Sequence, residues 1–391
     1  MQTVVIGAGV VGVSIAARLA ERGASVTVVD QGAPGGGTTS TSYAWVNANG
    51  KEPQPYYDLN LAGLEAHRAM SAGNLATGRG SWLGTGGHVE IAVDDTHRDH
   101  LAGRLARLTE LGYGAEVVTH ERAAALLPDV RVPDAAQLIV HFTREAYAYP
   151  TLYLAHMLGR ARAAGVRVLT GATVTGLRPS ASGGGEVLLD DGTLLAGSTI
   201  VSAVGRWTGE LAALAGADVP MQTFASPGDP TVGYLAETGP VPVRLDRLVT
   251  SPWLNVRPAG GGRLLLQALD LDTTADPTDV PGPASPLAEE FLRRLRDVLP
   301  GAEGARIERL VVGQRALPGD GRTIVGRTAR VPWLYVVATH SGVTLAPYLG
   351  DGVASEIYGE QVPAFAEFRP ERFHVDAAYE PVVAPRRPGE Q

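Results

Sequence analysis

Residues 3–30 read TVVIGAGVVGVSIAARLAERGASVTVVD, and this stretch decides how the fold begins. A short apolar run leads into closely spaced glycines, and a segment with helical spacing of apolar residues follows. A second β-branched run then ends at Asp30. This order predicts a strand, a tight turn, a helix and a second strand, which together open an α/β domain.

The glycines of this stretch follow the pattern G-x-G-x-x-G at Gly7, Gly9 and Gly12. Gly7 permits the turn, Gly9 lets the backbone approach a pyrophosphate, and Gly12 lets the helix pack closely on the strand. The helix N-terminus offers N–H groups to phosphates. Asp30 lies 18 residues after Gly12, where its carboxylate can accept hydrogen bonds from ribose hydroxyls and would repel a 2′-phosphate. The pattern predicts a dinucleotide site that disfavours NADP, with NAD and FAD as the alternatives.

The bulk composition is that of a globular protein of 391 residues, with 45% hydrophobic and 19% charged residues. This length allows two or more domains. A formal net charge of −8 argues against nucleic acid or an anionic membrane as a partner. The absence of cysteine excludes disulfides, thiolate metal sites and a thioether-linked cofactor. No apolar run reaches about 18 residues, and the first charge, Arg18, follows the apolar N-terminus, so we expect a cytoplasmic protein.

Further along the chain, residues 31–45, QGAPGGGTTSTSYAW, are too polar for a core strand. They form either a surface loop or a second cradle, in which Thr38, Thr39 and Ser40 donate to the pyrophosphate and ribityl part of an extended cofactor. Residues 165–211 predict several short strands punctuated by glycine-rich turns. Residues 333–359 predict a strand, a loop and a helix that opens at Ser341 and Gly342.

Five segments in this order carry a family resemblance. They are GAGVVG, TTSTSYAW, AVGRWT, GQRALPGDG and THSGVTLAP, within positions 4 to 358. Together they resemble the D-amino acid oxidase, glycine oxidase and sarcosine oxidase family of FAD-dependent amine oxidoreductases. One departure is the last block, where family members often carry G-H-S-G-x-G and this chain has THSGVT.

The resemblance implies an α/β fold in which a discontinuous Rossmann-like FAD-binding domain carries an inserted α+β substrate domain on an antiparallel sheet. The FAD-binding domain would comprise residues 1–50, 146–215 and 310–360. The substrate domain would comprise residues 51–145 and 216–309. Residues 361–391 would form a C-terminal extension with a disordered end, VVAPRRPGEQ.

The resemblance also implies non-covalent FAD and a set of residues that line it. In this set the backbone N–H groups from His340 to Leu345, at a helix start, suit the flavin edge where charge accumulates on reduction. The predicted cofactor residues are Gly7, Gly9, Val10, Val11, Gly12, Asp30, Gln31, Thr38, Thr39, Ser40, Tyr43, Ala44, Trp45, Val174, Gly205, Trp207, His340, Ser341, Gly342, Val343, Thr344 and Leu345.

The implied activity is oxidation of the C–N bond of an amino acid or N-substituted amino acid. Hydride passes to flavin N5, an imine forms and water hydrolyses it, with oxygen or another acceptor taking the electrons. One alternative is another flavoprotein class, such as a hydroxylase, although no late GDAAH-like block is present. A second alternative is a flavin- or nucleotide-binding protein without catalysis.

Two residues are candidates for contact with the substrate. Arg315 in GQRALPGDG matches the family arginine that holds the substrate carboxylate, and a planar guanidinium can do this through two parallel hydrogen bonds. The alternative is an ordinary ion pair among 32 arginines (33 lysines plus arginines, less one lysine). His340 would lie near the flavin by the same resemblance, or else would be a loop histidine satisfied by backbone groups.

Lys51 is the only lysine in the chain, and it follows TTSTSYAW by six residues. If that segment lies along the flavin, the ammonium can stabilise the charge that develops as oxygen accepts electrons. A lysine serves oxygen activation elsewhere in the family, in a different segment. The alternative is a solvated surface lysine.

The remaining candidates are interpreted as structural. His97 and His100 lie three residues apart on a predicted helix without a third ligand nearby, so no metal site is expected. Tyr147 and Tyr149 are interpreted as packing residues. The segments 101–114 and 285–301 have the periodicity of solvent-facing helices.

Overall fold

The computed structural model describes residues 1–373 and 382–384, and it opens with the expected βαβ unit. Helix α1 (Val10–Glu21) connects strands β1 (Gln2–Ile6) and β2 (Ser25–Asp30). The turn between β1 and α1 requires glycine. Gly7 has φ +105°, and a Cβ on Gly12 would lie 2.0 Å from the Gly7 carbonyl oxygen. Side chains are therefore excluded from both positions.

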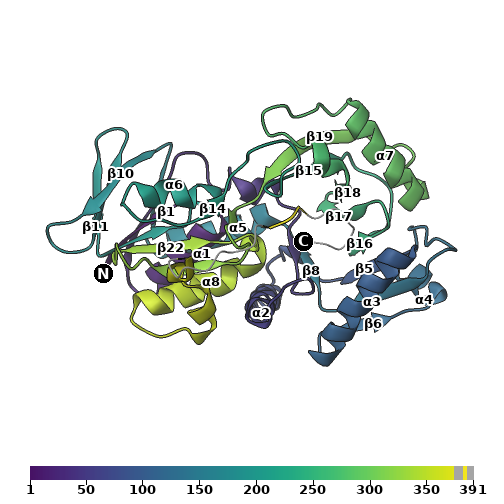
Figure 1. The fold of residues 1–391 in the computed structure, drawn as a ribbon, viewed down its shortest axis with the longest axis horizontal. Coiled ribbons are helices and arrows are strands. Elements are labelled where there is room, and N and C mark those ends of the chain that lie inside the picture. Colours follow the sequence, from purple (N-terminus) through teal and green to yellow (C-terminus); the bar gives the residue numbers. More distant parts are fainter. Residues whose placement is uncertain (374–381, 385–391) are drawn as a thin grey trace.

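A six-stranded sheet grows from this unit in the order β21-β22-β13-β1-β2-β9 (Figure 1). Its strands pair in parallel except β21, which runs antiparallel to β22. The parallel sheet confirms the Rossmann-like half of the predicted fold. The remaining strands are β9 (Arg167–Thr170), β13 (Thr199–Ser202), β21 (Ile324–Arg327) and β22 (Leu334–Ala338).

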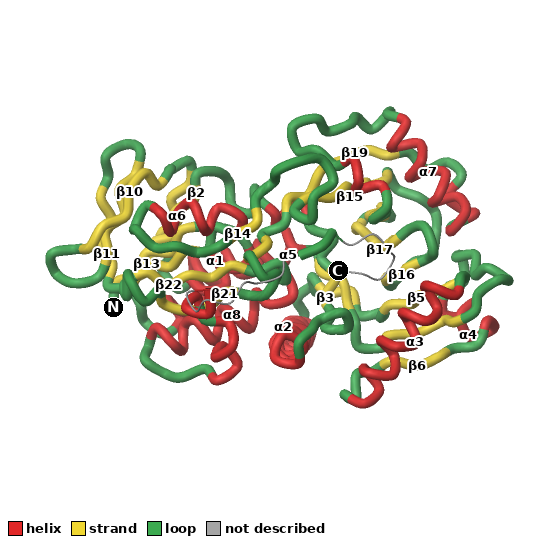
Figure 2. The backbone as a smooth tube through the Cα atoms, in the orientation of Figure 1, coloured by secondary structure: helices red, strands yellow, loops and turns green. Residues whose placement is uncertain are grey.

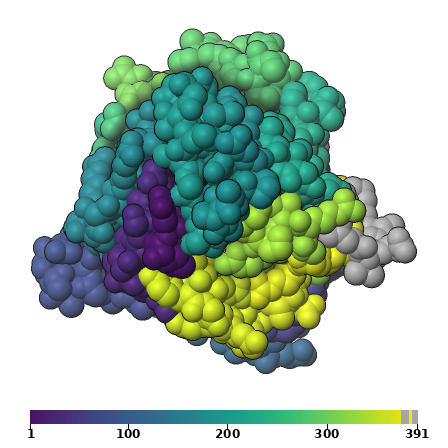
Figure 3. All heavy atoms as spheres, turned by 90° about the vertical axis from the view of Figure 1, so that its left-hand side faces the viewer, coloured from purple at the N-terminus to yellow at the C-terminus, as the bar shows by residue number. Residues whose placement is uncertain are grey.

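Both faces of this sheet are buried, because the side chains of a strand alternate between its faces. Val5 packs into the core formed with helices α1, α5 (Pro150–Ala163) and α8 (Gly342–Ile357). Val4 and Ile6 point the other way, toward a small sheet and helix α6. That layer comprises β10 (Val174–Pro179), β11 (Gly185–Leu189), β12 (Leu194–Gly197) and α6 (Thr208–Ala213). Figure 3 shows N-terminal residues lying between the middle and the C-terminal part of the chain.

The second large sheet has the order β19-β15-β18-β17-β16-β5-β7-β6 and is antiparallel except where β16 meets β5. This confirms the largely antiparallel sheet of the prediction. The strands are β5 (His88–Ala92), β6 (Ala115–Val117), β7 (Leu138–Phe142), β15 (Val232–Thr238), β16 (Leu248–Thr250), β17 (Asn255–Gly260), β18 (Arg263–Gln267) and β19 (Ile307–Gln314). Because β19 starts at Ile307 and belongs to this sheet, it crosses the expected boundary at residue 310; the domain limits remain predictions.

Amphipathic helices cover the second sheet where periodicity predicts them. Helix α7 (Pro286–Val298) buries Phe291 and Leu295, and helix α3 (Asp95–Glu110) buries Leu101 and Leu108. Both helices start at a side-chain cap: the Ser285 hydroxyl accepts from Ala288 N, and the Asp94 carboxylate accepts from His97 N. Helix α4 (His120–Leu126) completes this half.

Shorter elements connect the two sheets. Helix α2 (Gln54–Ala76) lies between them in Figure 2. The short strands are β3 (Trp45–Val46), β4 (Leu83–Gly84) and β8 (Ala146–Ala148), which form one sheet, and β14 (Met221–Gln222) and β20 (Leu317–Pro318), which form another. The 3-10 turns are Thr38–Thr41, Gly205–Trp207, Leu271–Thr274, Pro300–Ala302, Pro363–Phe368 and Pro370–Phe373.

The predicted disordered tail lies mostly outside the described residues. Within it, residues 382–384 are described, and they line a cavity. None of the described helices combines the length and the apolar character that a membrane crossing requires.

Candidate active site

A groove of about 720 Å³ runs along the carboxyl ends of β1 and β2 and past the N-terminus of α1. This is where an α/β sheet of this type binds nucleotides. The predicted cofactor residues that line it are Gly7, Gly9, Val10, Val11, Asp30, Gln31, Thr38, Thr39, Val174, Gly205, Trp207, His340, Gly342 and Val343.

The polar groups of the groove are preorganised. The Asp30 carboxylate accepts hydrogen bonds from Ala8 N at 2.7 Å and from Gly32 N at 2.8 Å. Four lone-pair sites on a carboxylate leave capacity for a ribose hydroxyl. The Thr39 hydroxyl accepts from Val10 N at 3.2 Å, and the first intrahelical bond runs from Val13 N to Gly9 O. The N–H group of Val11, which lines the groove, precedes that bond and suits a phosphate.

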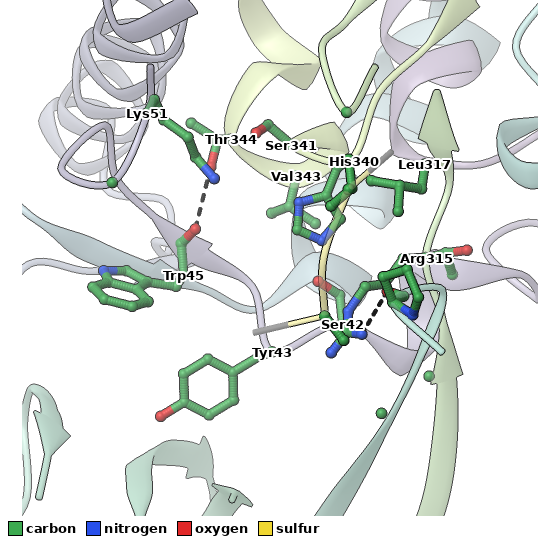
Figure 4. Close-up of a pocket in the computed structure, with 18 of the residues that line it drawn as sticks. Ser42, Tyr43, Trp45, Lys51, Arg315, Leu317, His340, Ser341, Val343 and Thr344 are labelled. Atoms are coloured by element: carbon green, nitrogen blue, oxygen red, sulfur yellow. Dashed lines mark hydrogen bonds between the residues drawn. The ribbon is translucent and has the colours of Figure 1, made fainter. Parts of the chain in front are cut away.

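A second cavity of about 550 Å³ adjoins the groove, and Thr38, Ser42, His340 and Val343 line both. We call this cavity the pocket; Figure 4 shows it. Its volume is in the range of small-molecule sites. The predicted residues that line it are Tyr43, Ala44, Trp45, Lys51, Arg315, Ser341 and Thr344, in addition to the shared ones.

The N-terminus of α8 forms one wall of the pocket. Neighbouring segments hold it: the Thr344 hydroxyl donates to the Trp45 carbonyl at 3.2 Å, and Tyr56 OH lies 3.0 Å from the Ser341 hydroxyl. The N–H groups of Gly342, Val343 and Thr344 precede the first bond of the helix, so they can face a ligand. The expectation for Leu345 was wrong, because its N–H already donates to the Ser341 carbonyl at 2.9 Å and its side chain is buried in the core.

Two other predicted cofactor residues lie outside the groove. Ser40 lines a separate small cavity, and its hydroxyl donates to the Gly37 carbonyl at 3.1 Å. The 3-10 turn at Thr38–Thr41 turns this side chain away from the groove, which a linear reading of the polar run missed. Gly12 lies behind the residues that line the groove. Because it has no side chain, the backbone of Gly7 can pack directly against it.

Arg315 reaches the pocket from the end of β19, and its guanidinium is fixed by the protein. One terminal nitrogen donates to the carbonyl oxygens of Pro230, at 2.8 Å, and Val232. The other lies 3.3 Å from the Asp272 carboxylate. These contacts use three of the five N–H groups of the side chain, so at most two can serve a ligand. A Cβ on Gly233 would lie 2.6 Å from this arginine, so a side chain there would displace the guanidinium.

His340 lies between Lys51 and Arg315 in Figure 4. Burial lowers the pKa of His340 to about 3, with further contributions from the positive charges of Lys51 and Arg315. The imidazole is therefore neutral across the physiological range. Lys51 is itself buried, at 5% exposure, and burial lowers its pKa to about 8 against the opposing effect of Glu145. The alternative of a solvated surface lysine was wrong.

A buried polar cluster that the sequence did not reveal supports the 43–51 segment. The Glu145 carboxylate accepts hydrogen bonds from Trp45 Nε1 at 2.7 Å, from Asn49 Nδ2 at 2.6 Å and from Tyr113 OH at 3.1 Å. His88 Nδ1 lies 3.1 Å from the same carboxylate. The cluster fixes the segment on which Lys51 lies. No spacing pattern links these residues, since they come from four separate segments.

Other residues missed by sequence reasoning line the two cavities. Tyr56, Gln267, Leu269, Asp320 and Arg322 contribute to the pocket, and Glu210 and Ala316 to the groove. Ala316 follows Arg315 directly, so the GQRALPGDG segment that predicted Arg315 could also have predicted Ala316. Tyr147 and Tyr149 are absent from the pocket lining and pack edge to face with centroids 5.6 Å apart. Among the described residues no group of histidine, cysteine, aspartate or glutamate could hold a metal, and His97 contacts Glu90 instead.

The fold and these two connected cavities define an α/β protein that holds an extended dinucleotide cofactor beside a polar pocket. The family model described as FAD dependent oxidoreductase matches residues 2–356. The chain belongs to this family. It is therefore an enzyme whose cofactor is FAD, which decides against NAD and against a non-catalytic nucleotide-binding protein.

Several relatives resemble the chain over nearly its whole length. A glycine oxidase of Bacillus licheniformis is 27% identical over 390 residues, covering 95% of this chain and 98% of the relative. The crystal structure of glycine oxidase from Geobacillus kaustophilus matches with TM-score 0.83 and 22% identity, covering 95% of this chain and 98% of that one. Iminodiacetate oxidase from a Chelativorans species matches with TM-score 0.78 and 23% identity, covering 94% and 98%.

The residues present fit FAD. Gly7 and Gly9 line the groove without side chains, the Asp30 carboxylate suits a ribose, and the groove continues into the pocket at Thr38 and Ser42. With no cysteine in the sequence, non-covalent attachment of FAD remains our prediction.

Proposed function

We propose that the enzyme oxidises the C–N bond of a small amino acid or N-substituted amino acid. The observation that carries this proposal is the position of Arg315, a fixed guanidinium in the wall of the pocket that adjoins the cofactor groove. A planar cation of this kind orients a carboxylate. Glycine oxidase and iminodiacetate oxidase, two relatives in fold, are named for substrates that carry both an amine and a carboxylate.

FAD, when bound, would supply the two-electron acceptor for the hydride on the carbon next to the substrate nitrogen, and oxygen or another acceptor would regenerate it. The nitrogen lone pair forms the C=N bond of the imine, and water then releases the carbonyl product and an amine or ammonia. The protein has to orient the substrate so that its α-carbon faces the flavin.

The pocket residues have distinct roles in this orientation. Arg315 orients the carboxylate with its planar guanidinium. The neutral imidazole of His340 borders the reacting region without adding a charge. The N–H groups at the start of α8 direct a positive partial charge toward the negative charge that develops on the cofactor.

An anaerobic titration tests the proposal. The purified yellow protein is mixed without oxygen with glycine, sarcosine, both enantiomers of alanine and proline, and amines that lack a carboxylate. We expect the flavin absorbance to bleach with amino acids and to persist with the simple amines. Bleaching by amines alone, or by no member of the panel, would contradict the proposal. Reoxidation of the bleached enzyme by oxygen or by a dye identifies the acceptor.

A further inference from the structure

Lys51 is held firmly at the pocket wall. It follows β3 in a turn closed by a hydrogen bond from Lys51 N to the Ala48 carbonyl at 3.2 Å. Arg107 donates to the carbonyl oxygens of Lys51 and Asn49 at 3.3 and 2.8 Å. The backbone of this turn is therefore fixed, and the side chain extends into the pocket beside Thr344 (Figure 4).

The ammonium of Lys51 makes no hydrogen bond or ion pair with the described residues. Its nitrogen lies 5.9 Å from the centre of the Tyr56 ring. Glu145 acts on it through space, but that carboxylate is already bound by Trp45, Asn49 and Tyr113. A buried charge without a partner is costly. An ammonium that is 5% exposed and lines a cavity is therefore ready to receive an anion.

The other charged side chains in the pocket wall have partners of opposite charge. Arg322 contacts the Asp320 carboxylate at 2.9 Å, and Arg372 contacts the same carboxylate at 2.8 Å. Glu52 contacts Arg107 at 3.3 Å. Arg315 is paired with Asp272. Lys51 differs from these residues because no carboxylate in the described part of the chain forms an ion pair with it, although Glu145 acts on it through space.

The two cations lie on opposite sides of a neutral group. Lys51 and Arg315 both lower the pKa of His340, and Figure 4 shows the imidazole between them. A substrate held at one end by Arg315 can thus place a second anionic group near Lys51. A single ammonium suits a monoanionic carboxylate better than a phosphate, which takes several donors.

We propose that Lys51 binds a second carboxylate of the substrate, so that the enzyme prefers amino acids with two carboxylates. The second carboxylate can be in the side chain or on the substituent of the nitrogen. This inference rests on the proposed function and specifies its substrate class. Lys51 is then a residue that determines specificity, and the oxygen-activating role suggested by the sequence becomes the competing outcome.

Isosteric pairs test the inference with the holoenzyme. Anaerobic flavin reduction is measured with aspartate against asparagine, glutamate against glutamine, and N-(carboxymethyl)glycine against N-(carbamoylmethyl)glycine, in both enantiomers where they exist. Each pair differs by a charge at nearly constant shape. We expect the acid to exceed the amide in kcat/KM by roughly 10- to 100-fold. The pair with the larger ratio shows whether the carboxylate belongs to the side chain or to the nitrogen substituent.

Failure of the inference and failure of the proposed function give different results. If acids and amides reduce the flavin equally well, the second carboxylate site is wrong and the proposed function stands. If no amino acid of this or the earlier panel reduces the flavin, both are wrong.

Variants then assign the effect to Lys51. Lys51→Met should bring the acid-to-amide ratio close to one, and Lys51→Arg should restore part of it. Arg322→Met is the matched control, because it removes a positive charge from the same wall while Asp320 keeps Arg372 as its partner. It should leave the ratio unchanged. If Lys51→Met leaves the ratio unchanged and slows reoxidation by oxygen, Lys51 serves the acceptor and the inference is overturned.

Discussion

The groove and the pocket are neighbouring cavities built in different ways. The groove depends mainly on local backbone: glycines without side chains and the start of α1. Its one charged group, the Asp30 carboxylate, accepts a hydrogen bond from Ala8 N, which is only 22 residues away in the chain. The pocket depends on side chains: Lys51, Arg315 and His340 come from distant segments and from both halves of the molecule. A backbone site tolerates few substitutions, whereas a side-chain site can change its ligand without changing the fold.

The difference explains why the cofactor is better defined than the substrate. All family members must bind the same FAD, so the same local arrangement of backbone serves in the groove of each. The pocket has to match one substrate, and here it contains an isolated lysine and an arginine that is already anchored to Asp272. Substitutions in the groove should therefore remove the cofactor, and substitutions in the pocket should change selectivity with the cofactor retained.

The largest expected effect is at Gly12. Gly12→Val would place atoms against the Gly7 carbonyl, from which even a Cβ would be only 2.0 Å away. We expect colourless or insoluble protein, measured as the ratio of flavin to protein absorbance after purification. Gly159→Ala is the control, since this helical glycine has nothing within 4 Å of a Cβ. It should be stabilised by about 0.5–1 kcal/mol. A yellow, stable Gly12→Val protein would contradict the backbone account of the groove.

The second effect concerns how the groove retains FAD. Because the sequence has no cysteine, we expect acid precipitation to leave a colourless pellet and free FAD in the supernatant. Absorbance spectra of both fractions provide the measurement. A yellow pellet would show a covalent bond and would mean that a side chain of the groove or the pocket is attached to the flavin.

Arg315→Met should produce the largest change within the pocket. It removes the charge that binds the carboxylate, so KM for the amino acid should rise by the equivalent of about 2–4 kcal/mol. The flavin content should stay near that of the parent protein. Steady-state kinetics and the absorbance ratio measure the two quantities. Unchanged saturation by the substrate would place the carboxylate anchor elsewhere.

Gly233→Ala tests whether the anchoring of Arg315 matters as well as its charge. The new Cβ would lie 2.6 Å from the guanidinium and 2.5 Å from the Asp272 carboxylate, so the pair must shift. We expect KM to rise roughly 3- to 30-fold, less than for Arg315→Met, because the charge remains. Gly176→Ala is the control, because this strand glycine likewise lacks a positive φ and a Cβ there would meet Leu188 only at an ordinary contact distance of 3.5 Å. Equal effects from both variants would point to a general loss of stability.

The smallest effect is the pH dependence of selectivity. The pKa of Lys51 is lowered to about 8, so the ammonium is charged below that pH and neutral above it. The ratio of kcat/KM for aspartate over asparagine should therefore fall as the pH rises through about 8. His340 does not titrate in this window, and Tyr56 has a raised pKa. If this ratio does not change between pH 6 and 10, the charge of Lys51 does not determine the selectivity.

The same shift has a consequence for stability. Because the pKa of Lys51 is lower in the folded protein than the usual 10.5, unfolding takes up a proton between about pH 8 and 10.5. The buried charge costs stability below this window, and the cost is lost as the pH rises through it. Lys51→Met should accordingly have a higher melting temperature than the parent at pH 7.

Local sequence patterns predicted much of the fold because their causes are local. The βαβ unit, helices α3 and α7 and the helix start at Gly342 each follow from periodicity, caps or glycines within a few residues. The patterns erred where a local turn redirected a side chain, as at Ser40, or where a helix used an N–H internally, as at Leu345. Neither outcome could be predicted from the residue types alone.

What the sequence determined by itself is the part of the groove within one βαβ unit, where the glycines act through backbone geometry and Asp30 supplies a carboxylate. What only the tertiary structure decided is the environment of each charge in the pocket. Arg315 and Lys51 look alike in the sequence as single cations, but Asp272 pairs with Arg315, whereas the carboxylate that acts on Lys51, that of Glu145, is hydrogen-bonded to Trp45. Burial and partners come from segments far apart in the chain. The charge state and availability of a side chain therefore depend on packing, which no short pattern records.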